Sequence, residues 1–201
     1  MIRLLLADDQ HLVRGALAAL LALEDDFEIV ASVPDGSSAV RAAAELRPDV
    51  ALLDVEMPYM DGISATREIC AGTPSVRVMI LTTFGRPGYL RRAMDAGARG
   101  FMVKDADPDR LARAIRDVHG GRTVVDPDLA VASLSSGANP LTEREADVLR
   151  AAEAGGTVSD LARQLHLSEG TVRNYLSAAI GKTGTRTRAE AARLARENGW
   201  L

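Results

Sequence analysis

The first 119 residues alternate apolar segments with amphipathic ones, and this alternation constrains the fold more than any other feature. The apolar segments lie near residues 2–7, 27–33, 49–53, 76–82 and 99–103. Each has the length of a buried strand, and the stretches between them carry apolar residues at helical spacing. Alternating strands and helices form a parallel sheet covered on both faces. The sequence therefore predicts an α/β domain, doubly wound, with a five-stranded parallel sheet.

The pattern becomes purely helical from Pro140 onward. Thr142 and Glu145 have the spacing of a capping box, which predicts a helix that runs to about Ala154. A short amphipathic stretch over 158–165 follows, and Ser168 is placed to cap a third helix over 169–182. With a last helix beginning near Thr187, this predicts an all-α four-helix domain. Two short helices separated by a tight turn indicate a helix-turn-helix.

These patterns predict three parts. Residues 1–119 form the α/β domain, residues 140–201 form the helical domain, and residues 120–139 connect them. The connecting segment is rich in glycine and small polar residues, with a short helix expected around residues 127–134.

Composition limits the class of protein. Hydrophobic residues make up 47% of the 201 residues, which is enough for packed cores. No apolar run reaches the roughly 20 residues of a membrane helix, and the chain enters its first strand without a leader-like segment. We therefore expect a cytoplasmic protein. The single cysteine, Cys70, cannot form an internal disulfide, and we expect it to pack as a small apolar residue.

Charged residues follow three of the predicted strands. Asp8 and Asp9 close the first apolar segment, Asp54 closes the third, and Lys104 follows the fifth. The carboxyl ends of parallel strands meet at one edge of a sheet, where such folds place their chemistry. Three carboxylates at one edge repel unless a cation intervenes, so a hard metal ion is expected there. An aspartate at a strand end can also be an ordinary helix cap or loop residue, and only the combination is specific.

The third predicted helix of the second domain has two distinct faces. Val172, Leu176, Ala179 and Ile180 share an apolar stripe, which leaves a polar face that can donate to bases and phosphates. The segment from Glu169 to Arg188 is also locally basic, although the whole chain has a net charge of −4. The candidate DNA contacts are Ser168, Thr171, Arg173, Asn174, Ser177, Lys182 and Arg188. The alternatives are a solvated face of a small bundle, or a surface that binds protein or RNA.

Two matched sets of motifs, in the right order, resemble a known family. The first set is Asp8-Asp9, Asp54-x-x-Met57-Pro58-x-x-Asp61-Gly62, Leu81-Thr82 and Phe101-x-x-Lys104. The second set is Leu141-Thr142-x-Arg144-Glu145, Leu161-Ala162 and Ser168-x-x-Thr171-Val172-Arg173-Asn174-Tyr175. The chain resembles two-component response regulators of the NarL/LuxR class over essentially its full length. The segments 81–89 and 170–175 further resemble the DesR-like subgroup.

This resemblance implies roles for the candidate residues. Asp54 would be the phosphorylation site, served by a sensor histidine kinase. Asp9, Asp54 and the carbonyl of Glu56 would hold Mg²⁺, with Asp8 in support. Lys104 and Thr82 would bind the phosphoryl group, and Phe101 would be the switch residue. Phosphorylation would promote a homodimer that binds a double-stranded DNA operator, with RNA polymerase as a further candidate partner. The protein would slowly hydrolyse its own aspartyl phosphate and would otherwise not be an enzyme.

Two other functions remain open. A regulator that works without phosphorylation would share the helix-turn-helix. A Mg²⁺-dependent phosphohydrolase would share the acidic edge, but it would usually need a second aspartate close after the nucleophile, where this chain has Val55 and Glu56.

Overall fold

The computed structural model describes residues 1–83, 87–135, 139–153 and 155–201. The chain divides into two compact units, the first comprising residues 1–85 and 89–132 and the second residues 86–88 and 133–201. Residues 84–86 of the DesR-like segment, residues 136–138 of the predicted connecting segment and Ala154 at a predicted helix end lie outside the described residues.

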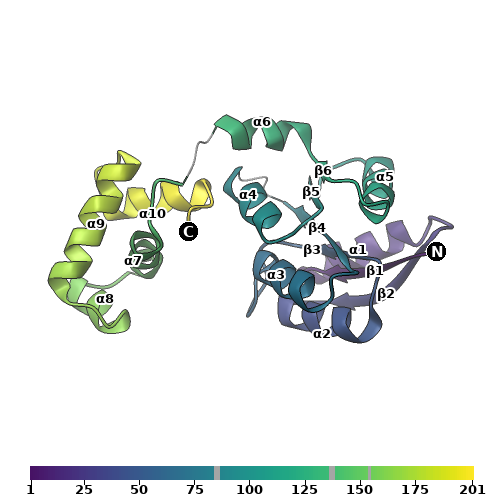
Figure 1. Cartoon of the computed structure of the whole chain (residues 1–201), viewed down its shortest axis with the longest axis horizontal. Helices are drawn as coiled ribbons and strands as arrows, with labels where there is room; N and C mark the ends of the chain where they lie inside the picture. Colours follow the sequence, from purple (N-terminus) through teal and green to yellow (C-terminus); the bar gives the residue numbers. More distant parts are fainter. Residues whose placement is uncertain (84–86, 136–138, 154) are drawn as a thin grey trace. The chain divides into compact units, whose positions relative to one another are not determined.

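The first unit contains a fully parallel six-stranded sheet with the order β2-β1-β3-β4-β5-β6 (Figure 1). The strands are β1 (Ile2–Ala7), β2 (Phe27–Val33), β3 (Val50–Leu53), β4 (Arg77–Thr82), β5 (Gly100–Val103) and β6 (Val124–Val125). The chain adds β2 on one side of β1 and then β3 to β6 on the other side, and this reversal of strand order makes the sheet doubly wound. The predicted fold class is confirmed.

β6 was not predicted and lies inside the expected connecting segment. Val124 and Val125 pair with Gly100 and Phe101 of β5, so the segment begins by extending the sheet. A two-residue strand is too short to give a periodic signal, and only its pairing with β5 defines it. The short helix predicted after it is present as α6 (Pro127–Ser135).

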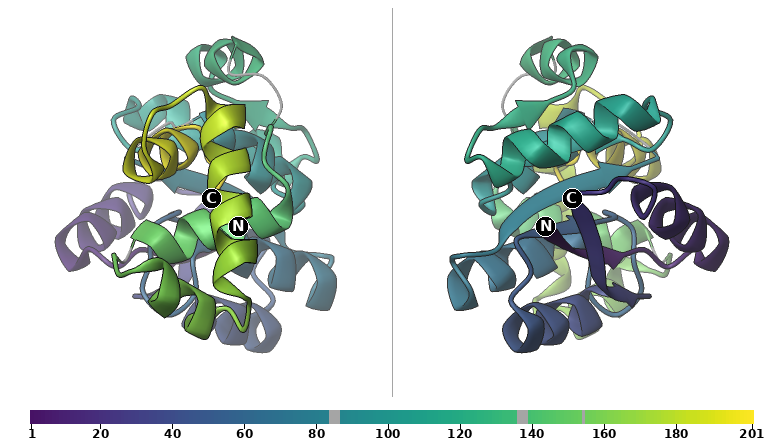
Figure 2. Two further views of the ribbon diagram at one scale, coloured as in Figure 1. Left: turned by 90° about the vertical axis from the view of Figure 1, so that its left-hand side faces the viewer. Right: turned by 90° about the vertical axis from the view of Figure 1, so that its right-hand side faces the viewer.

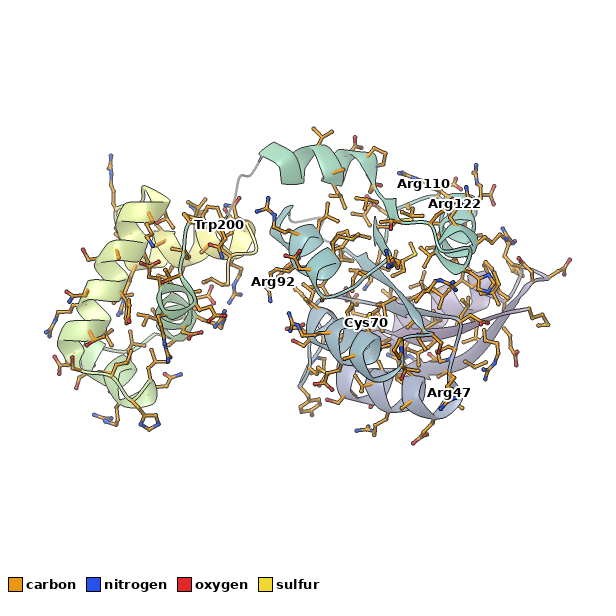
Figure 3. All side chains as sticks on the ribbon, in the orientation of Figure 1. Arg47, Cys70, Arg92, Arg110, Arg122 and Trp200 are labelled. Carbon is orange, nitrogen blue, oxygen red and sulfur yellow. The ribbon has the colours of Figure 1, made fainter. Side chains whose placement is uncertain are left out.

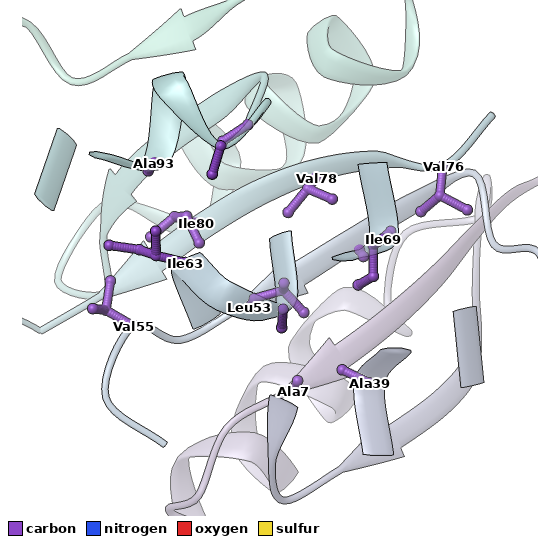
Figure 4. Packing of buried hydrophobic residues seen from close by; sticks show 14 of the residues in the cluster. Ala7, Ala39, Leu53, Val55, Ile63, Ile69, Val76, Val78, Ile80 and Ala93 are labelled. Carbon is purple, nitrogen blue, oxygen red and sulfur yellow. The ribbon is translucent and has the colours of Figure 1, made fainter. Parts of the chain in front are cut away.

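Helices cover both faces of this sheet. α1 (His11–Leu21) and α5 (Pro108–His119) pack on one face, over a cluster that includes Leu4, Leu52 and Ile115. α2 (Gly36–Leu46), α3 (Gly62–Gly72) and α4 (Pro87–Asp95) cover the other face. Figure 2 shows the strands between the two groups of helices, and Figure 4 shows Leu53 and Ile80 packed beneath the second group. The strands are thus buried on both sides, as their continuous apolar sequences predicted.

The second unit is a helical bundle. Its helices are α7 (Glu143–Glu153), α8 (Val158–Gln164), α9 (Glu169–Thr183) and α10 (Arg188–Glu197). One apolar cluster joins all four helices, and the only tryptophan, Trp200, packs against that cluster (Figure 3). The predicted capping box at the start of α7 is confirmed, because Thr142 N–H donates to Glu145 Oε2 at 2.7 Å and Glu145 N–H donates to Thr142 Oγ1 at 3.4 Å. Among the described residues, no helix is both long and apolar enough to cross a membrane.

Candidate functional site

The carboxyl edge of the sheet brings the predicted acidic residues together with Lys104. Lys104 Nζ lies 2.7 Å from Asp8 Oδ2 and 2.8 Å from Asp54 Oδ2, and all three side chains are less than a tenth exposed. One carboxylate oxygen from each of Asp8, Asp9 and Asp54 lies within 4.8 Å of the others. The three strand ends therefore converge on one acidic pocket, as the parallel topology requires.

Asp8 is held through all of its polar groups. Its Oδ1 accepts the N–H of Gln10 at 2.9 Å, and its Oδ2 is bound by Lys104. Its main-chain N–H donates to Val33 O at 3.1 Å, and its carbonyl accepts Nη1 of Arg14 at 2.5 Å. Asp8 is therefore fixed in place, whereas the neighbouring Asp9 is exposed to solvent. Sequence reasoning missed Arg14, because nothing in the local pattern links it to the strand end.

Asp54 is held on both sides as well. Its Oδ1 accepts the N–H of Val55 at 2.7 Å, and its main-chain N–H donates to Ala7 O at 2.9 Å. Gly62 packs directly against this segment, since a Cβ there would lie 1.8 Å from the carbonyl oxygen of Asp54. Asp61 caps α3 by accepting the N–H of Ser64. The Asp61-Gly62 motif thus starts α3 directly against the backbone of Asp54. Any residue other than glycine at position 62 would displace the loop that follows Asp54.

The electrostatics of the pocket are dominated by burial. Burial raises the pKa of Asp54 above its usual value, and the charge of Asp8 raises it further; the ion pair with Lys104 lowers it without cancelling these effects. Burial also lowers the pKa of Lys104, but its hydrogen bonds to Asp54 and Asp8 outweigh burial and raise that pKa overall. The pocket therefore favours the ammonium form of Lys104, and the charge of Lys104 offsets part of the cost of burying the Asp54 carboxylate.

The remaining predicted residues of this site lie around the pocket. Thr82 ends β4 and is buried, and its carbonyl accepts the N–H of Lys104 at 2.8 Å. Phe101 is fully buried in the core on β5. Glu56 lies two residues after Asp54, and its exposed Oε1 accepts a hydrogen bond from the hydroxyl of Tyr89 in α4 at 3.2 Å.

The donor set of the pocket suits a hard cation. Asp8, Asp9 and Asp54 offer only carboxylate oxygens, and Mg²⁺ prefers a few such ligands together with water and phosphate oxygens. The exposed position of Asp9 leaves one side of the group open for those additional ligands. The residues therefore fit a magnesium ion.

The two faces predicted for the third C-terminal helix are confirmed in α9. Val172, Leu176 and Ala179 are buried against the other helices. The opposite face is exposed at Gly170, Arg173, Asn174, Ser177 and Gly181. Ser168 caps the helix as predicted, since its Oγ accepts the N–H of Thr171 at 3.1 Å. Thr171 is half-buried, and its hydroxyl lies 2.8 Å from that of Ser168.

The three charged candidate DNA contacts also have partners within the unit. Lys182 Nζ lies 2.7 Å from Oε2 of Glu145, which is buried at the start of α7. Arg188 Nη2 donates to the carbonyl of Gly156 at 2.8 Å. Arg173 Nη2 lies 2.7 Å from Oε2 of Glu169, one turn earlier on the exposed surface of the same helix. Lys182 thus joins α9 to the start of α7, and Arg188 joins α10 to the segment before α8. The sequence contained no signal for either long-range contact.

Comparison with known proteins agrees with this geometry. Residues 4–116 match the family described as "Response regulator receiver domain", and residues 139–195 match "Bacterial regulatory proteins, luxR family". The chain is 44% identical over 201 residues to the uncharacterized transcriptional regulatory protein YvfU of Bacillus subtilis (strain 168), and the match spans both chains in full. It is 41% identical over 201 residues to the transcriptional regulatory protein DesR of the same organism, again over all of both chains.

A solved structure extends the likeness to three dimensions. The crystal structure of the response regulator ChrA from a heme-sensing two-component system is 33% identical, with a TM-score of 0.60, and the match covers 100% of this chain and 98% of ChrA. The predicted resemblance is therefore confirmed over both units. The chain belongs to the LuxR family of two-component response regulators, which are transcription regulators with a receiver domain and a DNA-binding domain.

Proposed function

We propose that phosphorylation of Asp54 by a sensor histidine kinase switches this regulator to a homodimer that binds a DNA operator through α9. The observation that carries the proposal is the pocket in which Lys104 binds both Asp8 and Asp54, with Asp9 at the open side. Such a pocket combines a buried nucleophile, a fixed cation and oxygen ligands for a metal. We assign residues 1–119 to the phosphoacceptor domain, 120–139 to the linker and 140–201 to the DNA-binding domain.

The phosphoryl group would move from a kinase histidine to one carboxylate oxygen of Asp54. The nitrogen–phosphorus bond breaks, an oxygen–phosphorus bond forms, and the imidazole leaves with the electron pair of the broken bond. Asp54 is oriented for this attack because Val55 N–H and Lys104 fix its two oxygens. Most of the catalysis in such a transfer is positioning and charge stabilisation.

Mg²⁺ would be held by Asp9, Asp54 and the carbonyl of Glu56, and when bound it neutralises charge on the transferring group. Asp8 would support the metal without binding it directly, through the contact of its Oδ2 with Lys104. Lys104 would shift its ammonium group from the carboxylates to a phosphoryl oxygen. Slow loss of the phosphoryl group to water would return the protein to its resting form.

Thr82 and Phe101 would transmit the signal. Phosphorylation adds a charge of about −1.5 to −2 and new acceptor oxygens. Thr82, at the end of β4, is placed to donate its hydroxyl to those oxygens, and Phe101 on the adjacent β5 would turn into the space that Thr82 vacates. The phosphoryl group would thereby shift the receiver domain toward the one of its two conformations that favours the dimer.

The dimer would place two α9 helices on two half-sites of the operator. The exposed Arg173, Asn174 and Ser177 are the residues we assign to base and phosphate contacts, with Ser168 and Thr171 at the helix start. Lys182 and Arg188 remain candidates for phosphate contacts, although both also bind within the unit. A regulator that meets a sensor kinase and a DNA operator would act in the cytoplasm, with RNA polymerase as a further candidate partner.

Phosphoryl uptake tests the first half of this proposal. The full chain is incubated with acetyl phosphate and Mg²⁺ and its intact mass is measured. Wild type and Asp105→Asn, which alters an exposed aspartate beside Lys104, should gain one phosphoryl group. Asp54→Asn should gain none. Uptake by Asp54→Asn would contradict the assignment of the site.

Selection of bound fragments from a random DNA pool tests the second half. It is run with Mg²⁺ alone and with Mg²⁺ plus beryllofluoride, a phosphoryl mimic. A repeated half-site enriched mainly with the mimic is the expected result. Equal enrichment in both pools would show a DNA-binding regulator that works without phosphorylation, and no enrichment in either would refute DNA binding.

A further inference from the structure

We propose that Arg14 is a positioning residue for the metal site, acting through the peptide that joins Asp8 to Asp9. This inference rests on the proposed Mg²⁺ site and adds a residue that its motif does not contain. Arg14 lies in the first turn of α1, is half-buried, and donates Nη1 to the carbonyl of Asp8. It also lines a small cavity of about 10 Å³ together with Asp8 and Asp54.

The planarity of the peptide bond makes this contact matter for Asp9. The carbonyl of Asp8 and the N–H of Asp9 belong to one rigid plane, so a donor that fixes the carbonyl also fixes where the Asp9 residue begins. The side chain of Asp8 is already tied to Gln10 and Lys104. Arg14 adds the main-chain tie, and it thereby orients the exposed carboxylate that is expected to bind the metal directly.

The charge of Arg14 and its positioning role predict opposite effects on metal affinity. A guanidinium beside a cation site repels the metal, so loss of the charge alone would tighten Mg²⁺ binding. Loss of a residue that orients a metal ligand typically weakens metal affinity by about 10-fold to 100-fold. The direction of the change in Kd therefore separates the two roles. A purely structural tie between α1 and β1 would lower stability and leave the Kd of the folded protein unchanged.

The experiment is a Mg²⁺ titration of the full-length protein, followed by the amide NMR shifts of Asp54 and Lys104. We expect Arg14→Met to raise the Kd for Mg²⁺ by about 10-fold, and Arg14→Lys, which keeps one donor and the charge, to recover part of the affinity. The matched control is Arg67→Met, which removes an exposed arginine from α3 of the same unit. It should leave the Kd unchanged.

The outcomes separate this inference from the proposed function. A folded Arg14→Met protein with the wild-type Kd, or with a lower one, would overturn the role of Arg14 while leaving the metal site intact. If that variant does not fold, Arg14→Gln takes its place with the same expectation, because the shorter side chain cannot reach the Asp8 carbonyl. A wild-type protein with no saturable shift would overturn the metal site itself and this inference with it.

Discussion

The ammonium group of Lys104 lies 2.8 Å from Oδ2 of Asp54, although the two residues are 50 positions apart in the sequence. The same group binds Asp8 at 2.7 Å, so one buried cation is shared by two buried carboxylates. Removing one partner from a buried ion pair is far more costly than breaking an exposed pair, because the remaining charge stays desolvated.

Lys104→Met should therefore destabilise the first unit strongly. Leaving Asp8 and Asp54 without their cation should lower the free energy of unfolding by about 3 kcal/mol. Mg²⁺ should restore more stability to this variant than to wild type, because it replaces the missing positive charge. Chemical denaturation with and without Mg²⁺ measures both effects, with the exposed Arg91→Met as the control. Equal stabilisation of both proteins by Mg²⁺ would contradict the shared-cation account.

Gly62→Ala should disturb the Asp54 loop. The added Cβ would lie 1.8 Å from the Asp54 carbonyl oxygen, so the loop must move, at a cost of about 1–3 kcal/mol. Phosphoryl uptake from acetyl phosphate should slow in the same variant. Gly72→Ala is a matched control at the other end of α3, where a Cβ meets nothing within 4 Å. Uptake at the wild-type rate in Gly62→Ala would show that the loop tolerates the shift.

The second unit should lose stability in acid through Glu145. Burial raises the pKa of this carboxyl, but its hydrogen bonds to Lys182 and Thr142 outweigh burial and lower the pKa overall. A carboxyl whose pKa is lower in the folded than in the unfolded state stabilises the protein when it is ionised. This contribution is fully present at pH values above the unfolded pKa, about 4.3, and is lost as the pH falls through the folded pKa. Unfolding followed by Trp200 fluorescence should show this loss below about pH 4.3.

Glu145→Gln tests the origin of that acid loss. Glutamine can keep the capping box with Thr142 but does not titrate. The variant should therefore show a shallower fall in stability with acid than wild type, whereas Glu143→Gln, which alters an exposed residue in the same first turn of α7, should behave as wild type. An identical acid profile for Glu145→Gln and wild type would exclude this carboxyl as the source.

Replacing Lys182 should mainly lower the stability of the second unit, whereas replacing Arg173 should mainly weaken DNA binding. Lys182→Met leaves buried Glu145 without its cation and should lower the stability of the unit by about 2 kcal/mol. Arg173→Ala removes an exposed side chain whose partner, Glu169, is also exposed, so stability should barely change. Its loss should instead weaken operator binding by about 1–3 kcal/mol. Fluorescence anisotropy with the selected DNA and Trp200-monitored denaturation give the two quantities, and a reversed pattern would refute the division.

The sequence by itself determined the elements and the edge where the chemistry lies. The continuous apolar segments predicted five strands. Asp8, Asp54 and Lys104 each follow one of these strands, and the carboxyl ends of parallel strands meet at one edge of the sheet, so the three residues were expected there. Local caps were equally readable at Thr142 and Ser168, because capping depends on residues within one turn. The box at Thr157 and Asp160 was missed although it has the same spacing.

Thr187 and Glu190 also have the spacing of a capping box, but the box formed only in part. Glu190 N–H donates to Thr187 Oγ1 as expected, but the Glu190 carboxylate accepts the N–H of Arg186 instead of that of Thr187. The spacing fixed which residues are near the helix start, and the path of the preceding turn decided which donor the carboxylate reaches.

Only the tertiary structure decided the contacts between distant segments. β6 exists because β5 offers a free edge to two residues. Arg116 of α5 binds Glu24 and Asp26, each at 2.6 Å, and its guanidinium lies over the ring of Phe27. The contacts of Arg14 with the Asp8 carbonyl and of Lys182 with Glu145 are of the same kind. A long flexible side chain binds a partner that lies close to it in the folded chain, and the periodicity of the sequence carries no information about that distance.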